Sequence, residues 1–461
     1  MEVFDLVVIG AGPGGYPAAI RAAQLGASVA IVEREKFGGT CLNWGCIPTK
    51  ALIAGAEAVH HARHPHIPGI SATVTADYAA LIGHKNKVVA QLTGGIKQLL
   101  TANGVKQFAG TASFVDRSTI AIDGKERIGA RKVILATGST SVVPGFLPKH
   151  PRVVESRAFL DRDKLPESMI VLGGGFIGCE IASMAAMLGV KVAIVEMLDD
   201  ILMLVDADVR KEVRTHMEKA LGIKVLSGQA MTDIVADAKS VSGKVGAETI
   251  RADLLLCSVG RKPVTDGLNL AAAGLTTTDK GTIETDACCR TKVATIYAIG
   301  DVTGKTQLAH FATSQGVTAA ENAISGKPAR HEELVPNVIF TAPEIGTVGL
   351  GEDDAKRAGR AIKTGKYRFA GLGKALAAGE PTGFVKWIAD AETDQLIGAV
   401  AVGAHATELV ATAAVAIRGE FTAKELGKTI FAHPTFSEAW MEAAHAVHGT
   451  CIHVTPTKKR N

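Results

Sequence analysis

The chain has 461 residues, of which 47% are hydrophobic and 21% charged, as expected for a soluble globular protein of about three domains. Its net charge of +4 is too small to suggest nucleic-acid binding, and no apolar run of about 18 residues indicates a membrane span. The odd number of cysteines, seven, does not fit a secreted disulfide framework. Strand-like residues begin at Val3, which leaves no room for a signal peptide. We therefore expect a cytoplasmic protein, although a processed organellar form would look the same.

The first predicted unit is a strand at 4–9, a glycine-rich turn, a helix that ends near Gly26 and a strand that ends in Glu33. The turn carries the glycines of a GxGxxG motif: Gly10, Gly12 and Gly15. Such glycines let a pyrophosphate approach the helix N-terminus, and the acid accepts hydrogen bonds from a ribose diol. The unit predicts a dinucleotide site, although one motif alone is also compatible with a structural turn.

Two cysteines follow this unit, in the run from Gly38 to Lys50. Cys41 and Cys46 are five residues apart, a spacing that in a regular helix separates Cα atoms by roughly 8–9 Å. A disulfide needs about 7 Å or less, so a bridge requires a distorted turn, for which Gly45 supplies the freedom. A strained bridge is readily reduced, so we predict a redox-active disulfide; two buried free cysteines are the alternative. We predict no metal site, because no second Cys/His pair with ligand spacing accompanies these cysteines.

A second unit repeats the first at one constant offset. It has a strand at 169–172, a glycine-rich turn, a helix to Gly189 and a strand that ends in Glu196. Its motif glycines are Gly173, Gly175 and Gly178. Two such motifs, each between a strand and a helix and each followed by an acid, are a much stronger signal than one. The sequence therefore predicts two dinucleotide sites.

The neighbouring segments indicate which cofactor each site binds. The first site is contiguous with the cysteines, and two later segments, 136–138 and 296–301, look directed at FAD. In the second of these, Asp301 can hydrogen-bond a ribityl hydroxyl. The second site is then left for the nicotinamide cofactor. NAD is favoured over NADP, because Glu196 beside a 2′-phosphate would cost on the order of 1–4 kcal/mol, and 197–203 has no Arg or Lys to compensate.

A histidine motif near the C-terminus can supply a base. A dithiol substrate reacts as a thiolate, so a nearby group must take its proton. His433 has the side chain suited to this task near neutral pH, and Glu438 can orient the imidazole. A His-Pro turn by itself would more often be structural.

Together these segments resemble the pyridine nucleotide–disulfide oxidoreductases over nearly the whole chain. The sharpest matches are Gly39–Lys50, Gly173–Glu180, Gly260–Pro263, Gly300-Asp301 and Phe431–Glu438. The resemblance implies an α/β fold with two Rossmann-like dinucleotide-binding domains and an α+β C-terminal dimerisation domain. The expected parts are an FAD-binding domain (1–141), an inserted NAD-binding domain (142–265), a return to the FAD/central domain (266–334) and an interface domain (335–461).

The resemblance also implies an activity: oxidation of dihydrolipoamide, or of the dihydrolipoyl groups of 2-oxoacid dehydrogenase or glycine-cleavage complexes, with electrons passing through the disulfide and FAD to NAD⁺. In this pattern Cys41 is the sulfur attacked by substrate, and Cys46 faces the flavin. His433 and Glu438 are implied to reach the disulfide of the opposite subunit, so the active site would require a homodimer. The expected partners are a lipoyl domain, a complex core and a second copy of the chain, with neither nucleic acid nor membrane.

The predicted site residues are completed by positions in the matched motifs. Lys50 should lie near the flavin, with Glu180 as its ionic partner. The predicted FAD-binding residues are Gly10, Gly12, Gly14, Gly15, Glu33, Thr40, Lys50, Gly110, Thr137, Gly138, Ser139, Asp301, Gln307, Leu308, Ala309 and His310. The predicted NAD-binding residues are Gly173, Gly175, Phe176, Ile177, Gly178, Glu196 and Gly260.

Two other functions stay open at this point. One is a related reductase for another disulfide, such as glutathione disulfide, which NADPH preference and arginines after the second acid would favour. The other is a flavoprotein scaffold without turnover. The joint presence of Cys41, Cys46, His433 and Glu438 argues against the scaffold.

Overall fold

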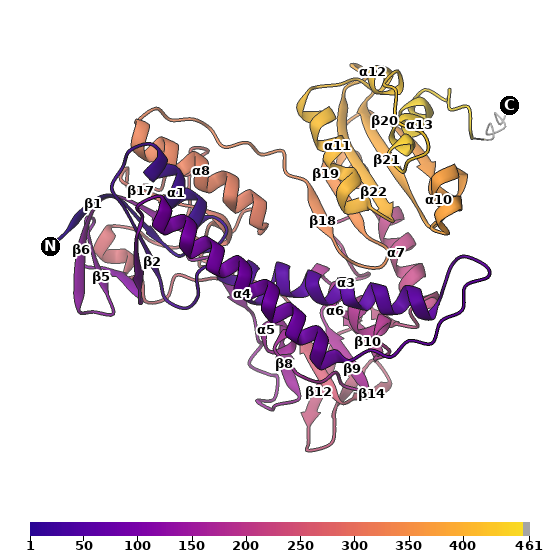
Figure 1. Ribbon diagram of the computed structural model, residues 1–461, viewed down its shortest axis with the longest axis horizontal. Helices are drawn as coiled ribbons and strands as arrows, with labels where there is room; N and C mark the ends of the chain where they lie inside the picture. The colour runs from indigo at the N-terminus through magenta and orange to yellow at the C-terminus, as the bar shows by residue number, and fades with distance from the viewer. Residues whose placement is uncertain (455–461) are drawn as a thin grey trace.

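The computed structural model describes residues 1–454, and its first part is built on a mixed sheet of order β3-β2-β1-β6-β5-β4 (Figure 1). The strands are β1 (Val3–Ile9), β2 (Val29–Glu33), β3 (Lys106–Ala109), β4 (Ala112–Phe114), β5 (Thr119–Ile122) and β6 (Glu126–Leu135). Strand β17 (Ile296–Ala298) returns much later in the chain and pairs in parallel with β6. The helices of this part are α1 (Gly15–Gln24), α2 (Gly39–Trp44), α3 (Cys46–Arg63), α4 (Tyr78–Ala102) and α8 (Ala309–Ser325), with 3₁₀ turns η1 (Leu270–Ala273) and η2 (Gly300–Thr303).

The second part is a five-stranded parallel sheet of order β11-β10-β9-β15-β8. Its strands are β8 (Val153–Glu155), β9 (Ser168–Leu172), β10 (Lys191–Glu196), β11 (Lys224–Ser227) and β15 (Leu254–Cys257), with helices α5 (Ser156–Leu160), α6 (Phe176–Met187) and α7 (Ala207–Lys219). A separate antiparallel sheet contains β12 (Met231–Ala236), β13 (Val241–Val245) and β14 (Glu248–Ala252). The chain enters and leaves this part through β7 (Ser139–Ser141) and β16 (Arg261–Pro263), which pair with each other. The predicted boundaries at 142 and 265 lie beside these two strands.

The third part is an antiparallel sheet of order β18-β19-β22-β21-β20. Its strands are β18 (Asn337–Ile339), β19 (Ile345–Gly349), β20 (Ile362–Arg368), β21 (Gly383–Asp390) and β22 (Leu396–Gly403). Its helices are α9 (Glu352–Arg357), α10 (Gly373–Ala378), α11 (Ala406–Arg418), α12 (Ala423–Gly427) and α13 (Glu438–Val447), with the 3₁₀ turn η3 (Phe369–Gly371). In its core the rings of Trp387 and Trp440 lie 4.6 Å apart, and the Trp387 indole donates to the Trp440 carbonyl. The predicted fold class is confirmed.

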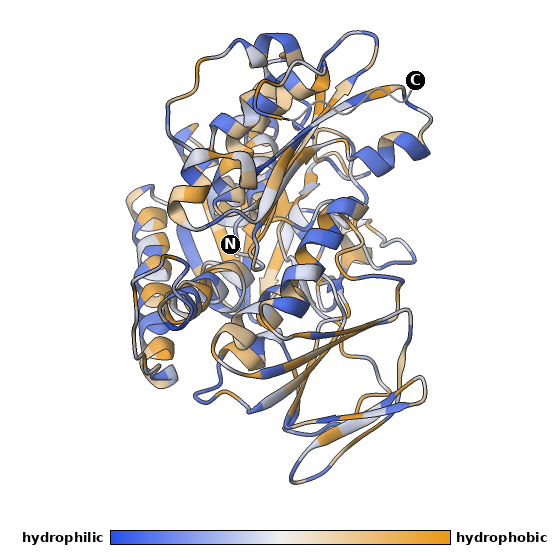
Figure 2. Ribbon diagram, turned by 90° about the vertical axis from the view of Figure 1, so that its right-hand side faces the viewer, coloured by the Kyte–Doolittle hydropathy of each residue, from blue (hydrophilic) through white to orange (hydrophobic). Residues whose placement is uncertain are grey.

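Hydrophobic residues concentrate in the central strands, whereas hydrophilic residues lie mostly on peripheral helices and loops (Figure 2). This distribution is what burial of apolar surface requires of a three-part molecule of this size. Within residues 1–454, no helix has both the length and the apolar character needed to cross a membrane.

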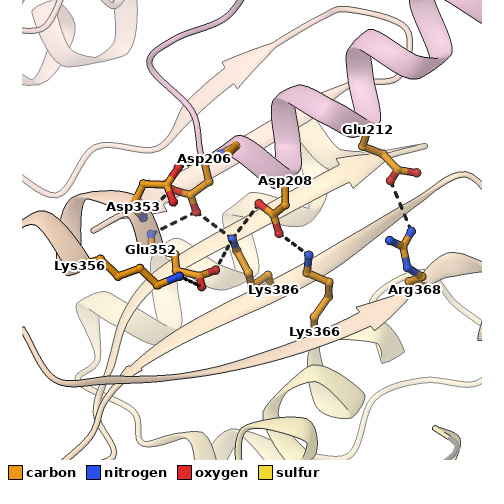
Figure 3. A network of polar contacts seen from close by, with 10 residues as sticks. Asp206, Asp208, Glu212, Glu352, Asp353, Lys356, Lys366, Arg368 and Lys386 are labelled. Atoms are coloured by element: carbon orange, nitrogen blue, oxygen red, sulfur yellow. Dashed lines mark hydrogen bonds and ion pairs between the residues drawn. The ribbon is translucent and has the colours of Figure 1, made fainter. Parts of the chain in front are cut away.

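A buried lysine joins the second and third parts (Figure 3). The Lys386 side chain, on β21, is 1% exposed, and its Nζ donates at 2.9 Å to each of three carboxylates: Asp206, Asp208 and Glu352. Asp206 and Asp208 lie at the start of α7, and Glu352 begins α9. Because a buried charge is tolerated only when it is paired and hydrogen-bonded, this cluster fixes how α7 sits against the third sheet.

Candidate active site

The two glycine-rich turns repeat each other in atomic detail. Gly10 has φ +102°, and a Cβ there would lie 2.3 Å from the carbonyl oxygen of Ala136. Gly173 has φ +106°, and a Cβ there would lie 2.6 Å from the carbonyl oxygen of Ser258. Both positions therefore need glycine for two reasons, the positive φ and the close approach of a neighbouring strand end.

The two acids are also held in the same way. The Glu33 carboxylate accepts hydrogen bonds from the backbone N–H groups of Ala11 (2.7 Å) and Glu35 (2.8 Å). The Glu196 carboxylate accepts from the N–H groups of Gly174 (2.6 Å) and Leu198 (2.8 Å). Each carboxylate oxygen keeps a free lone pair, so both acids can still accept from a ribose hydroxyl.

A cavity of about 500 Å³ lies beside the first turn. The predicted residues that line it are Gly10, Gly12, Gly14, Glu33, Thr40, Cys41, Cys46, Lys50, Gly110, Thr137, Gly138, Ser139, Phe176, Ile177, Glu180, Asp301, Gln307, Leu308, Ala309 and His310. Gly15 instead lies beneath the turn, against the Gly10 carbonyl. Five predicted NAD-binding residues do not line this cavity: Gly173, Gly175, Gly178, Glu196 and Gly260. Phe176 and Ile177, at the start of α6, reach it from the second part.

The cysteine pair lies at a break between two helices. Helix α2 ends at Trp44, Gly45 is non-helical (φ −135°, ψ −113°), and α3 begins at Cys46. A Cβ at Gly45 would lie 2.8 Å from the Thr40 carbonyl oxygen, so only glycine allows this break. The distorted turn predicted from the sequence is confirmed. Cys41 and Cys46 are not bonded to each other in the structure, and the disulfide between them stays a prediction.

The two thiols of the pair differ in acidity. A hydrogen bond from the Cys41 thiol lowers the pKa of Cys46, and the positive charge of Lys50 lowers it further. The same hydrogen bond, together with burial, raises the pKa of Cys41. Cys46 is therefore the more acidic thiol of the pair.

Lys50, on α3 of the first part, is fixed by contacts from the second and third parts of the molecule. Its Nζ lies 2.9 and 3.0 Å from the two carboxylate oxygens of Glu180, on α6, so the predicted ion pair is present. The same Nζ lies 4.4 Å from the ring centroid of Phe340, just after β18, a favourable cation–π distance. The Phe340 N–H also donates to Glu180 at 2.9 Å. Phe340 was not among the predicted site residues, since no local sequence pattern marks it.

Asp301 belongs to a second polar group in the cavity wall. It lies on η2, and its carboxylate accepts a 2.5 Å hydrogen bond from the Ser139 hydroxyl. Arg261 donates to the Ser139 hydroxyl (2.8 Å) and to the Ser139 carbonyl (2.7 Å). Arg261 was not among the predicted site residues, although it lies in the Gly260–Pro263 run, and the pairing of β7 with β16 brings it there.

His433 and Glu438 form a pair on the third part. The Nδ1 atom of His433 lies 2.8 Å from Oε1 of Glu438, whose Oε2 accepts from the Thr435 N–H at 2.8 Å. Although burial opposes it, the hydrogen bonds from Thr435 and His433 lower the pKa of Glu438. The Glu438 side chain is 16% exposed, but that of His433 is 77% exposed, and neither residue lines the cavity of its own chain. Their action on a second subunit stays a prediction.

Two family models match the chain. "Pyridine nucleotide-disulphide oxidoreductase" covers residues 4–316, and the dimerisation domain of the same family covers 335–444. Dihydrolipoyl dehydrogenase of Halobacterium salinarum is 44% identical over 97% of both chains, and that of Chlamydia muridarum is 40% identical over 99% of this chain and 100% of the relative.

Solved structures agree with these matches. LpdA from Mycobacterium tuberculosis is 27% identical, with a TM-score of 0.89 over 96% of this chain and 99% of that one. The HOCl-induced flavoprotein disulfide reductase RclA from Escherichia coli is 27% identical, with a TM-score of 0.87 over 95% of this chain and 99% of that one. The chain therefore belongs to the pyridine nucleotide-disulphide oxidoreductase family.

Proposed function

We propose that this protein is an FAD-dependent enzyme that oxidises dihydrolipoamide to lipoamide and reduces NAD⁺. The observation that carries the proposal is the thiol pair Cys41–Cys46, which lines the cavity beside the first glycine-rich turn, with Lys50 and Glu180 next to it. The family match and the dihydrolipoyl dehydrogenases among the relatives support the same activity.

The residues around the cavity suit a bound flavin dinucleotide. A Cβ at Gly12 would meet only Gly39 Cα within 4 Å, so the turn presents bare backbone to a ligand at the start of α1. Glu33, at the end of β2, is available for the ribose, and Asp301, on η2, lines the same cavity and is available for the ribityl chain. FAD bound there supplies two-electron transfer between a dithiol and NAD⁺. The second turn, with Glu196, is assigned to NAD⁺.

The protein's own groups account for the thiol chemistry. In the oxidised enzyme, His433 of a second copy takes a proton from one substrate thiol, and the resulting thiolate attacks Cys41 Sγ. The Cys41–Cys46 bond breaks, and Cys46 leaves as a thiolate beside the positive charge of Lys50. The second substrate thiol then attacks the mixed disulfide, releases lipoamide and returns Cys41 as a thiol. The products are lipoamide, the reduced pair with Cys41 as a thiol and Cys46 as a thiolate, and a protonated His433.

The shared active site is part of the proposal. His433 is exposed, and Ile430, three residues earlier in the chain, is 96% exposed; a large exposed apolar side chain is readily covered by another subunit. The dimerisation-domain match supports a homodimer. We further propose that the dimer acts in the cytoplasm on lipoyl domains of 2-oxoacid dehydrogenase or glycine-cleavage complexes.

The activity is tested by oxygen-free NAD⁺ reduction with dihydrolipoamide, run beside NADPH oxidation with glutathione disulfide. The proposal predicts rapid NADH formation in the first assay and none in the second. Activity only in the second assay would assign another disulfide substrate. No activity in either assay from flavin-loaded dimers would support the alternative of a flavoprotein scaffold without turnover.

Complementation tests the shared site. Cys46→Ser and His433→Gln homodimers should each be inactive, but each hybrid dimer contains one intact site. Random reassociation of an equal mixture should then restore about a quarter of wild-type activity, because half the dimers are hybrids and each hybrid has one intact site out of two. No recovery in proven hybrids would place both residues in one chain's site.

A further inference from the structure

Imidazoles and carboxylates gather at a second place, where the end of α3 meets the third part. His61 lies on the last turn of α3, His66 in the loop that follows, and Glu380 just after α10. One ligand atom from each of the three lies within 4.8 Å of the others, and His61 Nε2 is 3.9 Å from Glu380 Oε1. In Figure 1 the loop after α3 lies below α10.

The packing of two distant segments creates this cluster. Gly379 ends α10 with φ +72°, and a Cβ there would lie 2.8 Å from Cβ of His66. The missing side chain therefore lets the loop pack directly on the turn that carries Glu380. The rings of His61 and His66 meet edge to face, with centroids 5.6 Å apart. The three side chains are thus brought together by the fold.

Further imidazoles surround the cluster. The ring centroids of His60 and His64 lie 4.8 Å apart, and those of His60 and His61 lie 6.2 Å apart. A neutral imidazole offers a nitrogen lone pair to a metal ion, so this end of α3 is rich in such ligands.

We propose that His61, His66 and Glu380 form a binding site for a divalent transition-metal ion of the zinc type. Two imidazole nitrogens and one carboxylate oxygen are ligands that Zn²⁺, Co²⁺ and Ni²⁺ accept, whereas Mg²⁺ and Ca²⁺ prefer oxygen alone. Metal–ligand bonds of about 2.0–2.1 Å in a tetrahedron place the ligand atoms about 3.4 Å apart. Side-chain rotations that move these accessible ligand atoms by about 1 Å would therefore bring them to coordination distance. Water would complete the coordination.

The inferred metal ties two parts of the molecule together. His61 and His66 belong to the first part and Glu380 to the third, so the ion would pin the end of α3 to the interface domain. Helix α3 begins at Cys46 and carries Lys50, so the ion would brace the helix that carries the thiol chemistry from its far end. The role is structural, and the inference does not depend on which disulfide the enzyme uses.

The test is a Co²⁺ titration of the oxidised holoenzyme, in which the cysteine pair has no free thiol. We expect one Co²⁺ per chain, with ligand-field bands above 550 nm, beyond the flavin absorption, and displacement by Zn²⁺. His61→Ala and His66→Ala should each weaken binding at least tenfold, and Glu380→Gln should weaken it severalfold. His84→Ala, an exposed histidine on α4, should bind as the wild type does.

A thermal readout supplements the titration. Zn²⁺ should raise the unfolding temperature of the wild type and of His84→Ala, but not of His61→Ala or His66→Ala, since only a ligand bound to the native state stabilises it. Absent or non-stoichiometric Co²⁺ binding by wild-type protein, or unchanged binding by both histidine variants, would overturn the proposal. Sulfur-to-cobalt charge-transfer bands would overturn it too, by placing the ion on cysteines.

Discussion

The two glycine-rich units share one backbone design but have different surroundings. In both, the glycine turn faces a neighbouring strand end, and an acid at the end of the next strand holds the turn through backbone N–H groups. Around the first turn, the segments 136–140, 299–301 and 307–310 close a cavity that contains the cysteines. The second turn lies outside that cavity, and the residues after Glu196, Met197 and Leu198, are exposed.

One motif can thus serve two kinds of ligand. On the proposed assignment, the turn and the acid bind a dinucleotide, and the segments packed around them set how much of that ligand is shielded from water. An enclosed site suits a resident group such as FAD, and an open site suits one that must leave after each turnover, such as NADH. Variants of the two units test this division of roles.

The largest effect is expected from Cys46→Ser, which removes the chemistry of the enclosed unit. NADH formation from dihydrolipoamide should fall below about one-thousandth of wild type, because no disulfide can form to accept the substrate thiolate. Flavin content, read by visible absorbance, and NADH binding should be unchanged. The control is Cys288→Ser, a half-buried cysteine that does not line the cavity, which should keep its activity.

Matched glycine substitutions separate the two units. Gly10→Ala should yield protein that has lost most of its flavin, because the new methyl group strains the backbone and meets the Ala136 carbonyl. Gly173→Ala should keep its flavin and raise the KM for NAD⁺ at least tenfold. Gly83 lies on α4, where an added Cβ would meet open space, so Gly83→Ala should change neither the flavin content nor the KM for NAD⁺. Equal flavin loss in the first two variants would refute the division of roles.

Lys386→Met tests the ion pairs that hold α7 of the second part against the third part, instead of the second glycine-rich turn. Removing the lysine leaves three carboxylates without their shared partner, so the free energy of unfolding should fall by about 3–5 kcal/mol in chemical denaturation. Lys356→Met is the control, since it removes only an exposed partner of Glu352 and should cost less than about 1 kcal/mol. Equal losses of unfolding free energy in the two variants would mean that the burial of Lys386 does not determine its contribution to stability.

The same cluster predicts a pH dependence. Although burial opposes it, hydrogen bonds from Lys366 and Lys386 lower the pKa of Asp208, and those from Lys356 and Lys386 lower that of Glu352. Such carboxylates stabilise the fold fully above their ordinary pKa values of 3.8 and 4.5, and the contribution is lost as the pH falls through their lower folded values. Wild-type stability should therefore decline below about pH 4.5 more steeply than that of Lys386→Met.

The smallest effect is expected from Glu196→Gln, which changes the charge at the open site. Turnover with NADP⁺ should improve about tenfold, equivalent to about 1.4 kcal/mol, because the carboxylate no longer repels the 2′-phosphate. Asp199→Asn, an exposed neighbour, should have little effect on the ratio of kcat/KM values for the two nucleotides. An unchanged ratio for Glu196→Gln would show that this acid does not set the preference.

The sequence predicted best what depends on local backbone requirements. Both glycine turns, their acids and the break at Gly45 follow from short motifs, because each motif records a conformation that few residues allow. The Lys50–Glu180 pair was predicted from motif positions although its members are far apart in the chain.

Contacts between side chains of distant segments were not predictable in this way. Phe340 beside Lys50 and the carboxylates around Lys386 depend on how the parts pack, and no periodicity marks them. The histidine cluster was overlooked for the same reason, because Glu380 joins His61 and His66 only after α10 has packed on the loop.

A thiol count during reduction by NADH tests the central claim that the open unit delivers electrons to the cysteines of the enclosed one. Oxidised holoenzyme is mixed without oxygen with one NADH per chain, alkylated and mapped by mass spectrometry. We expect two new thiols per chain, at Cys41 and Cys46, and far fewer in Gly173→Ala at the same NADH concentration. New thiols at Cys288 and Cys289, or none at all in flavin-loaded wild type, would contradict it.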